Sequence, residues 1–261
     1  MFIGMGMPIP DLSNLPGPSR PGGGGGAFEY TAIDNSFSME FDGNSYYKID
    51  PKVEFGANNS GDTNTYTSFS GCCWLKPVTG SSYIQETPFS FGINVSNTGV
   101  SIARGYSAPV GQGTKIRIRA SSPSFFEKAG ATTLDDGNWH HIAWTMTYDP
   151  STVQFTIAVY VDGQPENQYG TTTPLTGVYG GDPAYKYGNL SGIGIQGYYD
   201  GNVGSYNYNG KIDEAAVWTT QVLSPETIQA IYDTTANNPG KVADLSETPE
   251  GQPTAWYRMG D

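Results

Sequence analysis

Hydrophobic and polar residues alternate along much of this chain. In the segment 153–161 every second residue is Val, Phe or Ile, and the segment 141–148 places Ile, Trp, Met and Tyr on one face. A shorter alternation at 115–119 has Lys or Arg at its other positions. A period of two residues is typical of β-strands. Asp-Gly pairs, in which Gly permits a positive φ, mark turns at 42–43, 136–137, 162–163 and 200–201.

One segment has the spacing of a helix instead. Ser224 is a favourable N-cap, Pro225 suits the first helical position, and Glu226 lies at the positive end of the helix dipole. The apolar residues that follow at helical spacing are Ile228, Ile231 and Tyr232. We therefore expect one short helix near the C-terminus, with a strand at 210–218 before it and a final strand at 255–259 after it.

The composition agrees with many short strands joined by tight turns. The 261 residues include 35 Gly, 18 Pro and 18 Tyr, and the alternating segments do not repeat at a fixed period, which argues against a propeller or solenoid. We predict an all-β sandwich of two antiparallel sheets. The adjacent Cys72 and Cys73 would point to opposite sides of a strand, one buried and the other outside.

Charge and hydropathy argue against two classes of partner. The net charge is −12 with 13 Lys and Arg residues, whereas binding to a nucleic acid backbone needs clustered basic residues. No stretch approaches the ~20 apolar residues of a membrane-spanning helix. The first ten residues lack the basic start of a secretory signal. We therefore expect neither nucleic acid nor membrane as a partner.

The first 26 residues differ in composition from the rest. They end in Pro21 and five glycines, which is typical of a flexible linker or a disordered tether. The segment also carries an apolar strip, with Met7 inside it, that a solvated tether would not need: Phe2, Ile3, Met5, Ile9 and Leu12. We interpret 1–26 as an extended assembly arm that packs on its own domain or on a neighbouring subunit, and 27–261 as the folded domain.

Five phrases in a fixed order resemble one known family. They are Ser38–Gly43, Ser70–Lys76, Asp136–Ala143, Val159–Gly163 and the strand and helix unit 210–232. Together they resemble the laminin-G-like, concanavalin-A-like lectin/glucanase jelly roll, over about residues 36–261. The resemblance implies two antiparallel sheets, one of them often concave. It also implies that some members hold calcium or a glycan at loops along one edge, while others are building blocks only.

A second resemblance concerns the style of the whole chain. A short Gly/Pro arm before such a domain, and the ending Trp256–Asp261, are similar to structural proteins of tailed, especially marine, bacteriophages. This resemblance implies a virion protein that assembles in the host cytoplasm. Its partners would be other virion proteins or further copies of itself.

The residues needed for glycoside hydrolysis do not occur in the required pattern. Retaining glucanases of this fold carry Glu-x-Asp-x-x-Glu on one strand, which keeps two carboxylates on the same face, and the sequence lacks this pattern. Asp213 and Glu214 are adjacent, so we expect their side chains on opposite faces, and the same holds for His140 and His141. We therefore predict that the protein is not an enzyme.

The candidate binding residues gather between 177 and 213. Calcium prefers oxygen ligands in loops, and Asp200, Asn202 and Asp213 could supply them, although turns require the same residue types. The side chains that could contact a glycan or a protein are Tyr185, Tyr187, Tyr198, Tyr199, Tyr206, Tyr208, Asn202 and Asn209. Tyr is also a common strand residue. Calcium is the one candidate cofactor.

These features predict a non-enzymatic virion structural or decoration protein that displays a jelly roll. The arm at 1–26 would mediate subunit assembly by burying its apolar residues. The alternative is a calcium-assisted carbohydrate-binding module used in adhesion, with surface glycans as its ligands.

Overall fold

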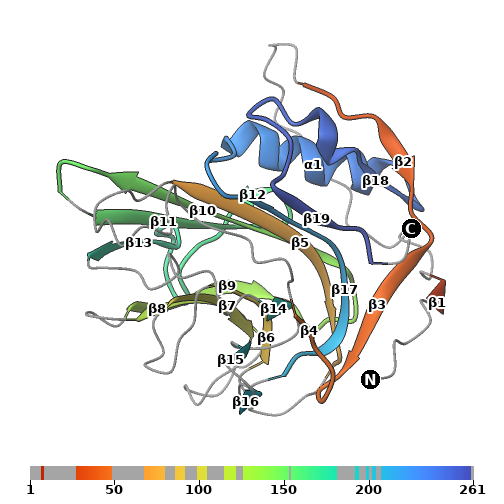
Figure 1. Ribbon diagram of the computed structural model, residues 1–261, viewed down its shortest axis with the longest axis horizontal. Helices are drawn as coiled ribbons and strands as arrows, with labels where there is room; N and C mark the ends of the chain where they lie inside the picture. Colours follow the sequence, from red (N-terminus) through yellow and green to blue (C-terminus); the bar gives the residue numbers. More distant parts are fainter. Residues whose placement is uncertain are drawn as a thin grey trace.

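Two antiparallel sheets face each other in the computed structural model, and a helix near the C-terminus lies outside one of them (Figure 1). This confirms the predicted sandwich and its helix. The structure describes residues 7–8, 28–48, 68–79, 86–91, 99–104, 115–121, 126–152, 154–180, 192–193, 198–199, 202–203 and 207–259.

The larger sheet is built around the longest strands of the chain. Its order is β1 (Met7–Pro8), β3 (Phe37–Asp42), β17 (Asn209–Trp218), β5 (Phe69–Pro77), β10 (His140–Asp149), β11 (Gln154–Val161) and β12 (Gln164–Pro165). Two further strands join it, with β13 (Thr176–Gly180) beside β11 and β19 (Ala255–Tyr257) beside β17. The alternating segments predicted at 141–148 and 153–161 correspond to the neighbouring strands β10 and β11, and the final strand expected at 255–259 forms over Ala255–Tyr257.

The smaller sheet covers the inner face of the larger one. Its order is β4 (Tyr47–Lys48), β14 (Gly192–Ile193), β6 (Glu86–Phe91), β7 (Gly99–Arg104), β8 (Lys115–Ser121) and β9 (Phe126–Thr133). Two short pairs stand apart, namely β15 (Tyr198–Tyr199) with β16 (Asn202–Val203), and β2 (Ala32–Asp34) with β18 (Lys241–Ala243). A 3-10 turn at Leu245–Glu247 follows β18.

The main core fills the space between the two sheets. Phe89 of β6 packs on Trp144 of β10, with ring centroids 5.3 Å apart. A side chain at Gly71 of β5 would overlap the Trp144 indole, so the large ring requires a glycine opposite it. Ile142, Trp144 and Met146 are fully buried on this inner face, as the alternation predicts. Burial of each such side chain stabilises the fold by about 2 kcal/mol.

Helix α1 (Pro225–Asn237) covers the outer face of the larger sheet (Figure 1). The Ser224 hydroxyl accepts a hydrogen bond from the backbone N–H of Thr227, which confirms the predicted cap. Ile228 and Ile231 bury their side chains in a second core that includes Cys72 on this outer face, while Cys73 lies in the main core. The prediction that one cysteine lies outside is therefore wrong, because the helix covers the face where we expected solvent.

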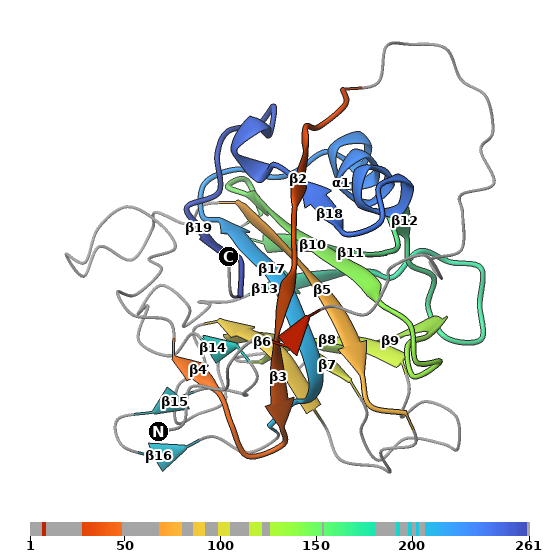
Figure 2. The same cartoon turned by 90° about the vertical axis from the view of Figure 1, so that its right-hand side faces the viewer.

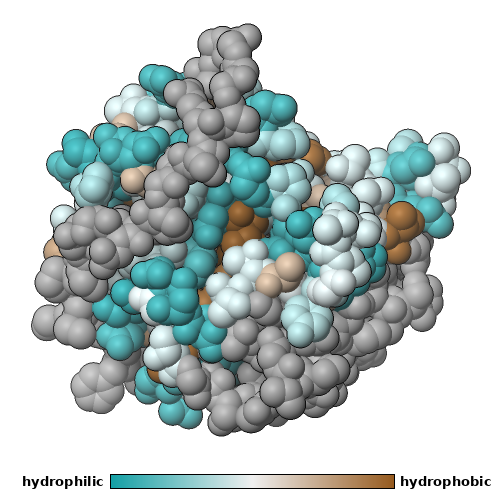
Figure 3. Space-filling model, turned by 180° about the vertical axis from the view of Figure 1, so that it is seen from behind, coloured by the Kyte–Doolittle hydropathy of each residue, from teal (hydrophilic) through white to brown (hydrophobic). Residues whose placement is uncertain are grey.

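The outer surface formed by the described residues is mostly polar. Seen from behind, the molecule is largely hydrophilic where it is described, and its hydrophobic areas are small and separate (Figure 3). Val178 on β13 is one of the exposed apolar side chains, with 58% of its surface accessible. No helix within the described residues is long and apolar enough to cross a membrane.

Candidate functional site

A β-bulge in β17 brings two carboxylates together. Three steps along β17, from Asp213 to Ala216, correspond to two steps along β5, and Glu214 has a φ of 49°. The Asn35 amide donates to Asp213 Oδ2 at 2.9 Å and to Glu214 Oε1 at 3.3 Å. The expectation that these neighbours point to opposite faces is therefore wrong, because the extra residue breaks the strand alternation.

The terminal segments close over this pair of carboxylates. The Trp256 indole N–H donates to Glu214 Oε2 at 2.6 Å, and Arg258 Nε lies 3.5 Å from Glu214 Oε1. Arg258 also donates to the backbone carbonyl of Asp34 at 2.9 Å, so it ties the end of the chain to β2. Asp213 and Glu214 are only 2% and 3% exposed. The pair therefore fastens the chain ends to the sheet and is closed to a substrate.

This geometry also shows the surroundings of one predicted calcium ligand, Asp213. The oxygens of Asp213 accept hydrogen bonds from the Asn35 amide and from the Glu214 backbone N–H. These partners already occupy both oxygens of Asp213, and calcium binding at this residue stays a prediction. Asp200 lies outside the described residues, and so does the side chain of Asn202. Within the described residues, no group of three His, Cys, Asp or Glu side chains is placed to hold a metal ion.

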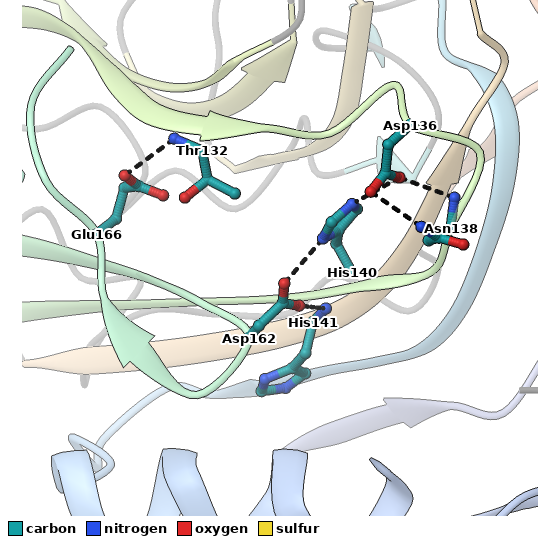
Figure 4. A network of polar contacts seen from close by, with 7 residues as sticks. All are labelled: Thr132, Asp136, Asn138, His140, His141, Asp162 and Glu166. Carbon is teal, nitrogen blue, oxygen red and sulfur yellow. Dashed lines mark hydrogen bonds and ion pairs between the residues drawn. The ribbon is translucent and has the colours of Figure 1, made fainter. Parts of the chain in front are cut away.

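His140 joins two turns at one end of the larger sheet (Figure 4). Its Nδ1 lies 2.9 Å from Asp162 Oδ2, and its Nε2 lies 3.1 Å from Asp136 Oδ1. Burial disfavours the charged ring, but the hydrogen bond and charge of Asp162, together with Asp136, outweigh burial and raise the pKa of His140 above 6.5. The ring therefore bridges the Asp136–Gly137 turn and the Asp162–Gly163 turn, and the two carboxylates favour its charged form.

Both of these turns are the predicted Asp-Gly turns. Gly137 has a φ of 86°, and the pair Asp162–Gly163 has φ values of 51° and 78°, as a two-residue hairpin turn requires. Asp162 also accepts a hydrogen bond from the His141 backbone N–H at 2.9 Å. The sequence thus predicts the turns, while their connection through His140 depends on the tertiary fold.

His141 lies on the opposite side of β10, and its ring points toward α1 (Figure 4). The split between the two histidines is as predicted. The ring packs 5.2 Å from the Trp74 ring, and neither of its nitrogens has a hydrogen-bond partner. Burial lowers the pKa of His141 to about 4, although the charge of Asp162 opposes the change. A cavity of about 10 Å³ lies beside the ring, lined also by Cys72 and Glu214.

Glu166 links the two sheets, and we found no sequence signal for it. Its Oε1 accepts hydrogen bonds from the backbone N–H groups of Ala131, Thr132 and Asn167 at 2.8, 3.3 and 2.9 Å (Figure 4 shows the Thr132 bond). Ala131 and Thr132 belong to β9 of the smaller sheet, whereas Glu166 follows β12 of the larger sheet. A buried carboxylate therefore fastens one edge of the sandwich.

The structure places only part of the predicted contact surface. Tyr208 is fully buried, packs on Phe41 and donates its hydroxyl to the Lys211 carbonyl, so its predicted role in surface contact is wrong. Asn209 is half-buried at the start of β17. The hairpin β15–β16 contains Tyr198, Tyr199 and Asn202, with Tyr199 opposite Asn202, but their side chains lie outside the described residues. The predicted residues that lie wholly outside are Tyr185, Tyr187 and Tyr206.

Two residues of the N-terminal arm are seated on the larger sheet. Met7 lies opposite Ser38 and Pro8 opposite Phe37, so β1 adds a short antiparallel strand to the edge of β3 (Figure 2). The arm residues named from the sequence lie outside the described part of the chain: Phe2, Ile3, Met5, Ile9 and Leu12. The arm therefore contacts its own domain through strand pairing at the Met7–Pro8 segment.

The sequence matches the model of one known protein family. Residues 41–229 match the model of the concanavalin A-like lectin/glucanases superfamily. The chain belongs to this superfamily. The matched residues fall inside the predicted domain 27–261, and the division at residue 26 stays a prediction. A comparison with curated protein sequences gave no match.

Solved structures with the same fold include several sugar-related domains. A carbohydrate-binding module of the Ruminococcus gnavus IT-sialidase, bound to α2,3 sialyllactose, is 12% identical with a TM-score of 0.50, over 75% of this chain and 95% of that one. Domain 4 of the Geobacillus stearothermophilus arabinanase AbnA is 17% identical with a TM-score of 0.44, over 86% and 84%. A heptameric SAP-like pentraxin from Limulus polyphemus is 16% identical with a TM-score of 0.44, over 75% and 81%. At 12% identity the similarity to the carbohydrate-binding module shows the fold alone.

Proposed function

We propose that this chain is a non-enzymatic structural or decoration protein of a virion, which displays its sandwich and assembles through its N-terminal arm. The observation that carries the proposal is the pairing of Met7 and Pro8 with the edge of β3. Adding a strand to a sheet edge is a common way to dock a peptide segment, because the backbone supplies the hydrogen bonds. An arm that docks in this way is suited to joining subunits.

The acidic clusters within the described residues support a structural role. Asp213 and Glu214 are buried beneath the chain ends, and Glu166 is bonded to backbone N–H groups. Asp136 and Asp162 flank His140. Each of these carboxylates fixes one segment of the protein to another, which favours a rigid displayed domain over a catalytic one.

The proposal is tested by the solution mass of the full chain and of a chain that starts at Ala27. Light scattering at protein concentrations up to about 1 mM should give an oligomer for the full chain at the highest concentrations and a monomer for the shorter one throughout. Tryptophan fluorescence should show that both are folded. A matched control replaces the polar Ser13 and Asn14 with Ala and should assemble normally. If the full and the shortened chains show the same oligomeric state at about 1 mM, arm-driven assembly is refuted.

A second candidate function is calcium-assisted carbohydrate binding. Membership of the lectin/glucanase superfamily and the hairpin that carries Tyr198, Tyr199 and Asn202 favour it. A ligand that binds only the native state raises its melting temperature. A melt with calcium, EDTA and a panel of oligosaccharides should then show a stabilisation that the double change Tyr198→Ala and Tyr199→Ala removes. The control Tyr169→Ala, at an exposed ring elsewhere, should leave it intact.

A further inference from the structure

We infer that in an assembled particle the arm of one copy pairs with β3 of a neighbouring copy. The inference rests on the proposed function, because it names the place where an assembly arm docks on its neighbour. The donor is the Met7–Pro8 segment, and the acceptor is the edge of β3 at Phe37 and Ser38. The partner is therefore a second copy of this chain.

Every copy carries the same acceptor. The pairing places Met7 opposite Ser38 and Pro8 opposite Phe37, so it joins two backbones. Such pairing depends on the geometry of the strand edge and is indifferent to which copy supplies the arm. Phe37 is 37% exposed, so the edge at this residue can be reached from outside. The contact formed within one copy is thus also available between two copies.

The chain between the arm strand and the domain is long enough for both arrangements. About 19 residues separate Pro8 from Phe28, and fully extended they span about 60 Å. To reach its own β3, the arm needs only to run back along Phe28–Phe37, which spans about 30 Å at most. The sequence of this segment includes five consecutive glycines, Gly22–Gly26, and glycine is the residue type with the fewest steric restrictions on φ and ψ.

Local concentration decides which copy receives the arm. Because the arm is tethered to its own domain, it meets that domain at an effective concentration of about 1 mM, so pairing within one copy dominates in dilute solution. Subunits packed on a particle meet at a comparable local concentration. Two neighbours that exchange arms also make two contacts at once, which strengthens the pair. Exchange therefore occurs when subunits are crowded and leaves dilute subunits monomeric.

Pro8 limits how far the pairing extends. Proline lacks a backbone N–H, so it is tolerated at a sheet edge but cannot donate a hydrogen bond to a further strand. The arm strand therefore covers the edge of β3 without offering an equally good edge to another chain. Growth of the sheet by addition of a further strand to the arm is therefore disfavoured.

Engineered cysteines at the paired positions test the exchange in the full chain. The native Cys72 and Cys73 are buried, so they do not compete in oxidation. A chain with Pro8→Cys and a chain with Phe37→Cys are mixed, concentrated to about 1 mM and oxidised. Exchange predicts a covalent dimer that contains one chain of each kind. The matched control replaces the second chain by Val178→Cys, on the exposed β13, and should give no dimer above background.

A double variant with Pro8→Cys and Phe37→Cys reports the pairing itself. In dilute solution it should form a disulfide within one chain. If it still forms only that bond at about 1 mM, and the mixed single variants give no dimer, the exchange is overturned although the pairing is real. Failure of the proposed function is distinguishable, because the chain that starts at Ala27 would then show the same oligomeric state as the full chain at about 1 mM.

Discussion

The two adjacent histidines should give the stability of this protein opposite dependences on pH. The pKa of His141 is about 4 in the folded protein and 6.5 in the unfolded chain. Below pH 6.5 the unfolded chain therefore binds a proton that the folded protein does not, so acid destabilises the fold. The pKa of His140 lies above 6.5, so its contribution is full below pH 6.5 and is lost as pH rises through the folded pKa.

The expected magnitudes follow from these environments. A difference of about 2.5 pKa units at His141 corresponds to about 3 kcal/mol of unfolding free energy between pH 6.5 and pH 4. His140 makes one charge-assisted bond to the partly buried Asp162 and one to Asp136, whose side chain is 43% exposed. The exposed partner contributes little because solvent screens it, so the bridge stabilises the fold by about 2 kcal/mol.

Two single variants separate these contributions. His141→Phe keeps a ring beside Trp74 but does not titrate, whereas His140→Gln removes the charged bridge. Urea unfolding followed by tryptophan fluorescence, from pH 4 to pH 9, gives the unfolding free energy of each chain. The advantage of His141→Phe over the wild type should grow as pH falls below 6.5. The unfolding free energy that His140→Gln loses relative to the wild type should shrink as the pH rises above 6.5. If the unfolding free energies of all three chains change with pH in the same way, the reasoning about the buried His141 and the His140 bridge is refuted.

Three further predictions concern packing and burial. Trp256→Phe removes a hydrogen bond to the buried Glu214 carboxylate and should lower the unfolding free energy by about 2 kcal/mol, while Tyr169→Phe, at an exposed ring, should leave it unchanged in the same urea assay. Gly71→Ala should destabilise by at least 2 kcal/mol, because the new methyl group overlaps the Trp144 indole; a melting temperature equal to the wild type would contradict that packing. Burial raises the pKa of both cysteine thiols, so neither should react with a thiol reagent until urea unfolds the chain.

Features set by local sequence were predictable. The alternation at 141–148 and 153–161 gave two neighbouring strands, and Ser224 with Pro225 marked the start of the helix. The Asp-Gly turns at 136–137 and 162–163 also formed as expected. In each case the signal lies within a few residues, because side-chain period and turn conformation are local properties of the backbone.

Features that depend on distant segments were not predictable. The bulge at Glu214 requires partners from both ends of the chain, Asn35 and Trp256, and the sequence around it reads as an unbroken strand. Burial of Cys72 depends on where α1 lies, and burial of Tyr208 depends on Phe41. Alternation gives the two faces of a strand, but the rest of the fold decides whether a face meets solvent or another layer.

The central claim is that the arm pairs with the edge of β3, because both the assembly and the exchange depend on that contact. Hydrogen exchange of the full chain and of the chain that starts at Ala27 tests it most directly. Deleting the arm should speed exchange in the peptide around Phe37 and Ser38, while the peptide from β10 around Trp144 keeps its protection. Equal exchange at Phe37 and Ser38 in both chains would contradict the claim.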